Sequence, residues 1–565
     1  MSVDTNNAAF QDALNLIQYT RQSVFLTGKA GTGKSTFLRY VCEHTKKKHV
    51  VLAPTGIAAI NAGGSTMHSF FKLPFYPLLP YDPNLSLQRV RIHEFFKYTK
   101  PHRKLLEQIE LVIIDEISMV RADLIDAIDR ILRVYSHNLR EPFGGKQLLL
   151  VGDVFQLEPV VKNDEREILN RAYPTPYFFS ARVFSQIDLV SIELQKVYRQ
   201  TDSVFVSVLD HIRTNTAGAA DLQLLNTRYG SHIEESEADM YITLATRRDT
   251  VDSINEKKLA ELAGEPITFE GSIEGDFPES SLPTSQELVL KPGAQIIFIK
   301  NDFDRRWVNG TIGVIAGIDE EEETIYVITD DGKECDVKRE SWRNIRYRYN
   351  EKTKEIEEEV LGSFTQYPIR LAWAITVHKS QGLTFSRVVI DFTGGVFAGG
   401  QAYVALSRCT SLDGIQLKKP INRADIFVRP EIVNFAGRFN DRQAIDKALK
   451  QAQADVQYAA AARAFDKGDM EECLEQFFRA IHSRYDIEKP VPRRLIRRKL
   501  GIINTLQEQN KKLKEQMREQ QERLRQYAHE YLLMGNECIT QAHDARAAIA
   551  NYDKALSLDP NYIDA

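Results

Sequence analysis

The sequence has few cysteines and no large excess of either charge. Its 565 residues include five cysteines, none of them in a Cys-x-x-Cys pair. This spacing argues against a zinc site or a disulfide framework and indicates thiols kept in a reducing compartment. The formal net charge is −5, from 73 Lys and Arg against 78 Asp and Glu. The whole chain is therefore no polycation, and a grip on nucleic acid would need a local basic lining.

Long apolar runs are also missing. No run approaches the roughly 18 residues of a membrane-spanning helix. The N-terminus carries Asp4 and lacks the basic segment followed by an apolar segment that marks a secretion signal. We expect a soluble, unsecreted protein that binds no membrane. Its length predicts roughly three or four domains.

The sequence does contain a glycine-rich stretch, Gly28–Ser35, between an apolar run and an amphipathic helical pattern. Strand, glycine-rich loop and helix in this order are the context that the Walker A spacing requires. Backbone N–H groups of such a loop surround the nucleotide phosphates. Lys34 is predicted to reach the β- and γ-phosphates, and the Ser35 hydroxyl to bind Mg²⁺. The predicted ATP-binding residues of this stretch are Gly28, Ala30, Gly31, Thr32, Gly33, Lys34, Ser35 and Thr36.

Polar residues follow several short apolar runs that predict buried parallel strands. The runs are Ser23–Thr27, His49–Ala53, Leu111–Ile114 and Gln147–Val151. Ligands bind at the carboxyl ends of such strands. Asp115 and Glu116 follow the third run, and we predict that Asp115 holds Mg²⁺ while Glu116 orients the attacking water. Gln156 follows the fourth run and is a candidate sensor of the γ-phosphate.

These segments, in this order, resemble the motifs of superfamily 1 helicases. Gly28–Ser35 resembles motif I, Ala53–Ala59 motif Ia, Asp115–Val120 motif II and Gly152–Val160 motif III. The resemblance covers roughly residues 1 to 430. Motif III has Leu-Glu-Pro at residues 157–159, where the family often has two prolines.

A finer resemblance lies between motifs II and III. An amphipathic helix is predicted over Asp123–Leu132, and Pro-Phe-Gly-Gly follows at residues 142–145. This insert is similar to the signature of the PIF-type (petite integration frequency) helicases of superfamily 1B. That resemblance implies movement from 5′ to 3′ on single-stranded DNA.

The second half of the motor carries segments similar to helicase motifs IV, V and VI. The resemblance implies that Arg199 and Arg408 meet the charge that develops in the transition state. Gln381 and Gly382 would lie on the γ-phosphate side, and Gln11 belongs to a weakly patterned segment that would select adenine. The residues assigned to DNA binding are Pro54, Thr55, Gly56, His68, Phe143, Gly144, Thr246, Asn309, Thr376, His378 and Lys379.

The resemblance implies an α/β fold with two RecA-like P-loop NTPase domains. The first is expected over residues 1–190, with a small insert at about 70–100, and the second over 191–308 plus 362–430. Residues 309–361 contain five short β-like runs and would form an SH3-like barrel. Residues 264–285 are interpreted as a mobile acidic loop.

Residues 431–565 are expected to form an α-helical tail. Two sets of positions match tetratricopeptide helix pairs: Ala461, Ala464, Gly468, Phe477 and Ala480, then Ala548, Tyr552, Ala555 and Pro560. Between them runs a heptad-like seam through Ile503, Leu506, Leu513, Met517, Leu524 and Tyr527. The seam fits an intramolecular hairpin or a self-association stripe, and its short length favours the hairpin. We expect the repeats to continue beyond residue 565 and to bind a protein partner.

The leading hypothesis is a monomeric DNA helicase that uses ATP and Mg²⁺ and moves 5′ to 3′ on single-stranded DNA. It would open duplex, fork or structured DNA in genome maintenance. It would act in the nucleoid of a bacterial cytoplasm or in a eukaryotic nucleus. One alternative is a helicase similar to the RecD subunit of recombination nucleases. A second is a scaffold whose tetratricopeptide tail does the work while the ATPase acts as a switch.

Overall fold

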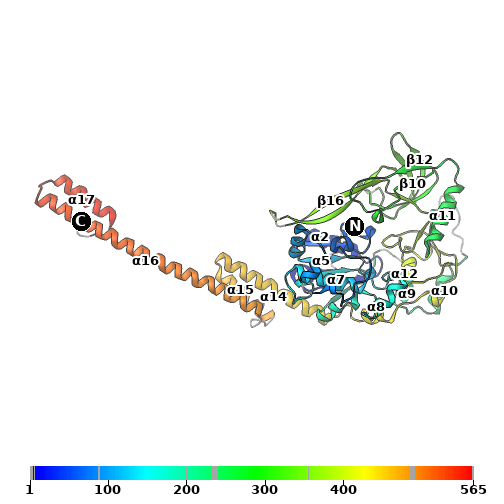
Figure 1. The fold of residues 1–565 in the computed structure, drawn as a ribbon, viewed down its shortest axis with the longest axis horizontal. Coiled ribbons are helices and arrows are strands. Elements are labelled where there is room, and N and C mark those ends of the chain that lie inside the picture. The colour runs from blue at the N-terminus through cyan, green and yellow to red at the C-terminus, as the bar shows by residue number, and fades with distance from the viewer. Residues whose placement is uncertain are drawn as a thin grey trace. The chain divides into compact units, whose positions relative to one another are not determined.

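The fold was analysed in a computed structural model (Figure 1). It describes residues 4, 7–86, 89–198, 202–230, 240–304, 306–350, 352–353, 355–483 and 490–562. The chain divides into two compact units, Met1–Ala459 and Ala460–Ala565. The first unit contains two α/β lobes, each built on a parallel sheet, together with antiparallel sheets.

The first lobe is built on a six-stranded parallel sheet in the order β3-β2-β4-β5-β1-β6. The strands are β1 (Val24–Gly28), β2 (His49–Ala53), β3 (Ser65–Thr66), β4 (Leu111–Ile114), β5 (Gln147–Val151) and β6 (Val190–Leu194). The four apolar runs predicted as strands are thus confirmed. Nearly all their residues are buried because helices cover both faces of the sheet.

Two clusters of apolar side chains enclose this sheet. On one face, α1 (Ala8–Tyr19) and α2 (Lys34–His44) pack together through Phe10 and Phe37, whose ring centroids lie 4.8 Å apart. The opposite face is covered mainly by α7 (Ala122–Tyr135), the confirmed amphipathic helix. The remaining helices of the lobe are α3 (Gly56–Ala62), α4 (Met67–Phe71), α5 (Arg89–Phe95), α6 (Lys100–Gln108) and α8 (Asn163–Asn170).

The segment after residue 430 returns to the first lobe. Ile432 of α13 (Pro430–Ala436) is buried in the core beneath α7. Ile445 and Ala448 of α14 (Arg442–Lys467) are buried in the core with α1 and α2. The expectation that a separate tail begins at residue 431 therefore differs from the structure, where this part of the chain completes the first lobe.

The second lobe is built on a four-stranded parallel sheet in the order β18-β7-β19-β20. Its strands are β7 (Ile242–Ala245), β18 (Ala374–Thr376), β19 (Val388–Asp391) and β20 (Ile415–Leu417). Its helices are α9 (Ser203–Arg213), α10 (Ala219–Asn226), α11 (Arg248–Glu261) and α12 (Gln401–Leu406). The mixed α/β class with parallel sheets is confirmed.

Antiparallel strands pack against the second lobe, whose core includes Ile297 and Ile312. One five-stranded sheet has the order β14-β13-β12-β11-β17, a three-stranded sheet the order β15-β16-β9, and β10 pairs with β8. The bounds are β8 (Ile267–Glu270), β9 (Ser272–Gly275), β10 (Glu287–Leu290), β11 (Gln295–Phe298), β12 (Ile312–Asp319), β13 (Thr324–Thr329), β14 (Glu334–Val337), β15 (Glu340–Asn350), β16 (Glu355–Gln366) and β17 (Ile369–Leu371). The strands of residues 309–361 thus pair with strands from outside that segment.

The interpretation of residues 264–285 as an acidic loop is wrong. This segment contains β8 and β9, and β9 pairs with β16 from Gly362↔Gly275 to Thr365↔Ser272. The side chains of β9 are exposed, so its sequence has no apolar alternation that would reveal a strand. Backbone pairing at a sheet edge, rather than side-chain burial, makes this segment a strand.

The β15–β16 hairpin extends to the first lobe (Figure 1). Tyr347 is buried in the first-lobe core, and its hydroxyl accepts a hydrogen bond of 3.3 Å from the backbone N–H of Val51. In the predicted insert at about 70–100, Leu78, Leu85 and Ile92 are buried. Phe75 in that insert is 83% exposed and lies parallel to the His68 ring at 5.0 Å.

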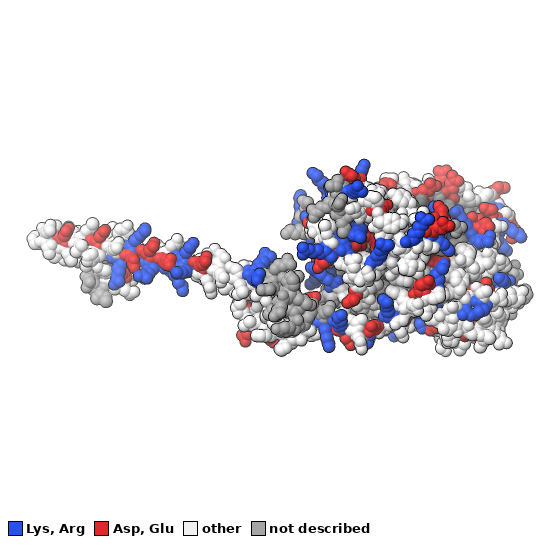
Figure 2. All heavy atoms as spheres, turned by 60° about the horizontal axis from the view of Figure 1, so that its bottom comes forward, with Lys and Arg blue, Asp and Glu red and all other residues white. Residues whose placement is uncertain are grey.

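The C-terminal unit is helical, as predicted, with α15 (Met470–Ser483), α16 (Pro490–Thr540) and α17 (Ala545–Leu558). Gly535 of α16 leaves room for the ring of Tyr552, which would lie 2.4 Å from a Cβ at that position. The seam is exposed, with Leu513 at 55% and Met517 at 63%, so the intramolecular hairpin over it is wrong for the described residues. Charges of both signs alternate along this helix (Figure 2). Within the described part of the chain, no helix has both the length and the apolarity needed to cross a membrane.

Candidate nucleotide site and strand path

The loop after β1 is shaped by glycines. Gly28 has φ +154°, and a Cβ at this position would lie 2.7 Å from the carbonyl oxygen of Leu194. Gly33 begins α2 with φ +89°, a left-handed conformation that favours glycine. Gly31 also has a positive φ, of 80°. The loop therefore turns tightly into a helix N-terminus, where unpaired N–H groups and the helix dipole favour a phosphate.

Lys34 lies along this loop. Its Nζ donates hydrogen bonds to the carbonyl oxygens of Gly28, at 2.7 Å, and Lys29, at 3.0 Å. Ser35 and Thr36 follow in the first turn of α2. The structure thus gathers the predicted phosphate-binding residues at one helix end, with Thr32, whose Oγ1 donates to the carbonyl of Lys29 at 2.9 Å. Gln11 lies in α1, beside α2.

The two predicted catalytic carboxylates follow β4. Glu116 has φ +49°, an uncommon conformation for a residue with a side chain, and its N–H donates to Asp115 Oδ1 at 2.9 Å. Burial raises the pKa of Asp115. Burial, and next the Asp115 carboxylate, raise the pKa of Glu116, while Lys34 and Arg408 act in the opposite direction. Both carboxylates therefore lie within the electrostatic reach of the loop lysine.

One side chain of the second lobe reaches this centre. Gln381 Nε2 donates to Glu116 Oε2 at 2.8 Å and to Gln156 Oε1 at 3.3 Å. Gln156 lies after β5, and its Nε2 donates in turn to Asp153 Oδ2 at 3.4 Å. The structure therefore brings together residues from the segments resembling motifs II, III and V. Gly382 comes next, with φ +83°.

Arg408 is fully buried within the second lobe. Its guanidinium donates to the carbonyl oxygens of Val404 at 2.9 Å, Ser380 at 3.3 Å and Leu383 at 3.3 Å. These bonds hold both ends of the short segment that carries Gln381. Arg199, the other predicted arginine, lies outside the described residues.

Further contacts join the lobes around the glycine-rich loop. The N–H of Ala30 donates to the Tyr403 hydroxyl of α12 at 3.0 Å. Gly400, which begins α12 with φ +77°, lies so close to motif III that a Cβ there would meet the carbonyl oxygen of Gln156 at 2.3 Å. The unusual Glu158 of motif III pairs with Arg429 at 2.8 Å and accepts a hydrogen bond from the Tyr177 hydroxyl at 3.1 Å.

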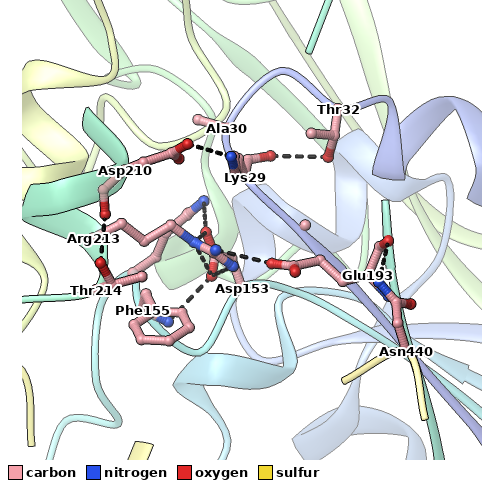
Figure 3. A network of polar contacts seen from close by, with 12 residues as sticks. Lys29, Ala30, Thr32, Asp153, Phe155, Glu193, Asp210, Arg213, Thr214 and Asn440 are labelled. Carbon is pink, nitrogen blue, oxygen red and sulfur yellow. Dashed lines mark hydrogen bonds and ion pairs between the residues drawn. The ribbon is translucent and has the colours of Figure 1, made fainter. Parts of the chain in front are cut away.

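A buried network was not predicted from the sequence (Figure 3). Arg213, at the end of α9, pairs with Asp153 of motif III at 3.1 Å and with Glu193 of β6 at 2.8 Å. Its guanidinium lies over the Phe155 ring, 4.4 Å from the centroid. One turn earlier, Asp210 pairs with Lys29 of the glycine-rich loop. A cation in the last turn of an amphipathic helix is an ordinary pattern, so nothing in the sequence marks Arg213.

The residues assigned to DNA binding lie on both lobes. Pro54 and Thr55 follow β2, and the Thr55 side chain caps α3 by accepting from the Ala58 N–H at 3.2 Å. Gly56 packs so closely on Ser281 that a Cβ there would meet its Oγ at 2.8 Å. His68, in α4, stacks on the exposed Phe75.

In the second lobe, the predicted DNA-binding residues cluster near β18. Thr376 accepts a hydrogen bond from the Lys379 N–H at 3.2 Å, and His378 lies parallel to the exposed Phe397 ring at 6.5 Å. Thr246 is buried after β7, and its Oγ1 has no hydrogen-bond partner within the described parts of the chain. Burial lowers the pKa of Lys379, and nearby Arg370 lowers it further.

A pocket lies between α3 and the β18 region. It is lined by Ile57, Ile60, Asn61, Pro283, Ile297, Ile299, Asn309, Trp342, Arg370, Ile375, Lys379, Gln381 and Leu383. Burial alone lowers the pKa of Arg370 to about 10, and among the described residues its guanidinium has no hydrogen bond or ion pair. An unpaired, largely buried guanidinium favours an anion in this pocket. Lys379 and Gln381, two residues apart, link the pocket to the carboxylate centre.

The assignment of Phe143 to DNA binding does not fit the structure. Its ring is 1% exposed and packs in the first-lobe core, 6.3 Å from the Phe184 ring. Its N–H donates to the buried Asp129 of α7 at 2.6 Å. A Cβ on Gly144 would lie 2.6 Å from the carbonyl oxygen of Leu132. The Pro-Phe-Gly-Gly segment therefore packs against α7 and does not form a surface for a DNA strand.

Comparisons with known proteins agree with this arrangement. The family model described as PIF1-like helicase matches residues 4–217. The ATP-dependent DNA helicase Pif1 of Campylobacter jejuni is 33% identical over 412 residues, which cover 70% of this chain and 88% of that protein. A crystal structure of Bacteroides sp. Pif1 in complex with ADP-AlF4 is 41% identical, with a TM-score of 0.70, and covers 76% of this chain and 96% of that one.

A second crystal structure, of Bacteroides Pif1 bound to ssDNA, is 40% identical with a TM-score of 0.56 and covers 79% of this chain and 99% of that one. The similarity thus extends beyond the glycine-rich loop, through both lobes. Identity above 30% over most of a relative's length, together with the family model, decides the assignment. The chain belongs to the PIF1-like helicase family.

Proposed function

We propose that this protein is an ATP-dependent DNA helicase that moves 5′ to 3′ on single-stranded DNA and opens duplex or fork DNA. The observation that carries the proposal is the hydrogen bond from Gln381 to Glu116, which joins the second lobe to a catalytic carboxylate. The same short segment carries Lys379 in the anion-favouring pocket. A DNA strand bound in the pocket and ATP hydrolysed at the carboxylates would therefore both contact the segment that carries Lys379 and Gln381.

ATP would lie on the glycine-rich loop, with Lys34 on its β- and γ-phosphates. Mg²⁺ would be held by the Ser35 hydroxyl and the Asp115 carboxylate, an all-oxygen set of the kind that Mg²⁺ prefers, completed by phosphates and water. Glu116 would orient the attacking water, and Gln156 and Gln381 would sense the γ-phosphate. Arg408 would stabilise transition-state charge, with Arg199 as the second candidate arginine.

Single-stranded DNA would bind along the predicted DNA-binding residues of both lobes. Arg370 and Lys379 supply positive charge for a phosphate, and Asn309 lines the same pocket. The exposed Phe75 and the half-buried His68 form a stacked aromatic pair on which a base can stack. The Bacteroides relative bound to ssDNA supports DNA as the partner.

The finer architecture is also a proposal. Both lobes are proposed to be RecA-like, and the antiparallel strands around residues 309–361 to act as an SH3-like module. The helix pairs α14–α15 and α16–α17 fit the tetratricopeptide pattern, since Ala461, Ala480, Ala548 and Ala555 are buried between helices. We infer a protein partner for this unit, a monomeric motor and a place beside DNA in the nucleoid or nucleus.

The test measures ATP hydrolysis by the purified chain with and without oligo-dT, together with unwinding of duplexes that carry a 5′ or a 3′ single-stranded tail. The proposal predicts strong stimulation by DNA and unwinding from the 5′ tail only. Unwinding from the 3′ tail would refute the polarity and leave a helicase. Slow hydrolysis that DNA does not change would favour the ATP-switched scaffold.

A further inference from the structure

Arg213 is part of a second-lobe helix, but its charged group pairs with carboxylates of the first lobe. It ends α9, whose Phe205, Leu209 and Ile212 are buried in the second-lobe core. Its side chain is only 4% exposed, and its guanidinium pairs with two carboxylates of the first lobe. Figure 3 shows the side chain inserted between these carboxylates. Burying a charge is costly, and pairing with opposite charges in this way offsets the cost.

Asp153 and Glu193 connect Arg213 to different parts of the first lobe. Asp153 accepts from Arg213 Nη2 at 3.1 Å, from the Phe155 N–H at 3.2 Å and from Gln156 Nε2 at 3.4 Å. Its backbone carbonyl also accepts from the Gln156 N–H at 3.0 Å. Through Gln156 this branch reaches Gln381, the residue bonded to Glu116.

The Glu193 branch leads away from the carboxylate centre. The backbone N–H of Glu193 donates to Asn440 Oδ1 at 2.8 Å, and Asn440 Nδ2 donates to the Glu193 carbonyl at 3.2 Å. Asn440 lies just before α14, whose Ile445 and Ala448 pack in the first-lobe core. The two carboxylates therefore share one cation, but only one of them contacts a predicted γ-phosphate sensor.

We propose that Arg213 is a positioning residue that fixes Gln156 through Asp153, so that hydrolysis depends on α9 being seated against the first lobe. The proposal rests on the proposed ATP hydrolysis at this site. Asp210 of the same helix pairs with Lys29 of the glycine-rich loop, so α9 holds both the loop and motif III. When α9 shifts with its lobe, the γ-phosphate sensor loses its support.

Electrostatics favour a permanently charged Arg213. Burial by itself lowers its pKa, but Asp153, Tyr403 and Glu193 outweigh burial, and the net pKa is raised. The network therefore does not switch by deprotonation of Arg213. The network instead depends on where α9 lies, because moving the Arg213 guanidinium away from Asp153 and Glu193 would leave two buried carboxylates without a counter-charge.

The experiment compares two isosteric substitutions that each remove one partner of Arg213. Asp153→Asn changes the branch that contacts Gln156, and Glu193→Gln changes the branch that does not. We expect Asp153→Asn to lower kcat for ATP, with oligo-dT saturating, by about 10- to 100-fold, the effect of one charge-assisted hydrogen bond. Glu193→Gln should keep kcat within about threefold. KM for ATP should change little in both, because neither substitution touches the glycine-rich loop.

A third variant, Arg213→Lys, keeps the positive charge. A single ammonium replaces the planar fork and cannot serve both carboxylates as well, so kcat should fall to an intermediate value. Melting curves on all three proteins report the structural cost separately. Equal kcat losses in Asp153→Asn and Glu193→Gln, in parallel with melting temperature, would show a structural ion pair and overturn the proposal. Wild-type kcat in both Asp153→Asn and Arg213→Lys would overturn it as well. Failure of the unsubstituted protein to hydrolyse ATP would instead refute the proposed function.

Discussion

The bond between Gln381 and Glu116 allows a quantitative prediction. Gln381→Ala removes an amide that donates to Glu116 at 2.8 Å and to Gln156 at 3.3 Å. The first acceptor is a carboxylate, and hydrogen bonds to charged groups contribute about 1.5–3 kcal/mol. The second is longer and joins neutral groups, so the first dominates the effect.

If the lost bond orients Glu116 in the transition state, its free energy appears in the barrier. A barrier increase of about 1.5–3 kcal/mol lowers kcat about 10- to 150-fold, at about 1.36 kcal/mol per factor of ten. KM for ATP should change less, since Lys34 and the glycine-rich loop stay in place. Glu116 would also lose a donor that favours its charged form, which shifts its titration to higher pH.

The assay is steady-state phosphate release with saturating oligo-dT across a range of ATP concentrations. Gln223→Ala is the matched control, because Gln223 is an exposed glutamine of α10 in the same lobe. The control should keep wild-type kcat. A loss of less than about threefold in Gln381→Ala would mean that this contact makes no contribution to turnover, and the reasoning from it would fail.

Further predictions concern other residues of the site. Lys34→Ala should abolish ATP hydrolysis while the protein keeps its melting temperature. Arg408→Ala should cut turnover by about 10³ to 10⁵, as expected for an arginine finger, and a loss of only a few-fold would assign that role to another residue. Burial and Asp115 raise the pKa of Glu116, so its active carboxylate form accumulates only as pH rises beyond the ordinary glutamate range. Turnover should therefore rise with increasing pH around pH 7, the value to which the pKa of Glu116 is raised. Glu116→Gln should remove this rise in turnover, because the amide does not titrate. Arg370→Gln should reduce the slope of log affinity for oligo-dT against log salt by about 0.7, the value for one phosphate on a single strand, whereas the exposed Arg166→Gln should not.

Much of the first lobe could be predicted because its information is local. Short apolar runs must be buried strands in a parallel sheet, and polar residues at their ends must meet at one edge. That reasoning, together with the upstream glycine-rich loop, made Asp115, Glu116 and Gln156 candidate site residues. Gln381 came from resemblance to a motif, and the structure supplies its physical partner, Glu116.

The residues missed or misjudged depend on distant partners. Arg213 is marked only by Asp153 and Glu193, which lie 60 and 20 positions away in the sequence. Strand β9 has exposed side chains and is defined by pairing with β16. Phe143 lies in a glycine turn that looks exposed in sequence, yet its ring completes the core against α7. Local pattern carries no information on such contacts.

The length of α16 has a consequence for any partner of the C-terminal unit. With 51 residues, this helix extends about 77 Å at about 1.5 Å per residue. Helix α17 packs on the C-terminal part of α16, so a molecule bound there is held far from the start of α16. At about 3.4 Å per base pair, the length of α16 equals that of about 23 base pairs of B-form DNA. A partner bound near α17 and a molecule bound near the start of α16 would therefore be separated by a distance that the length of α16 sets.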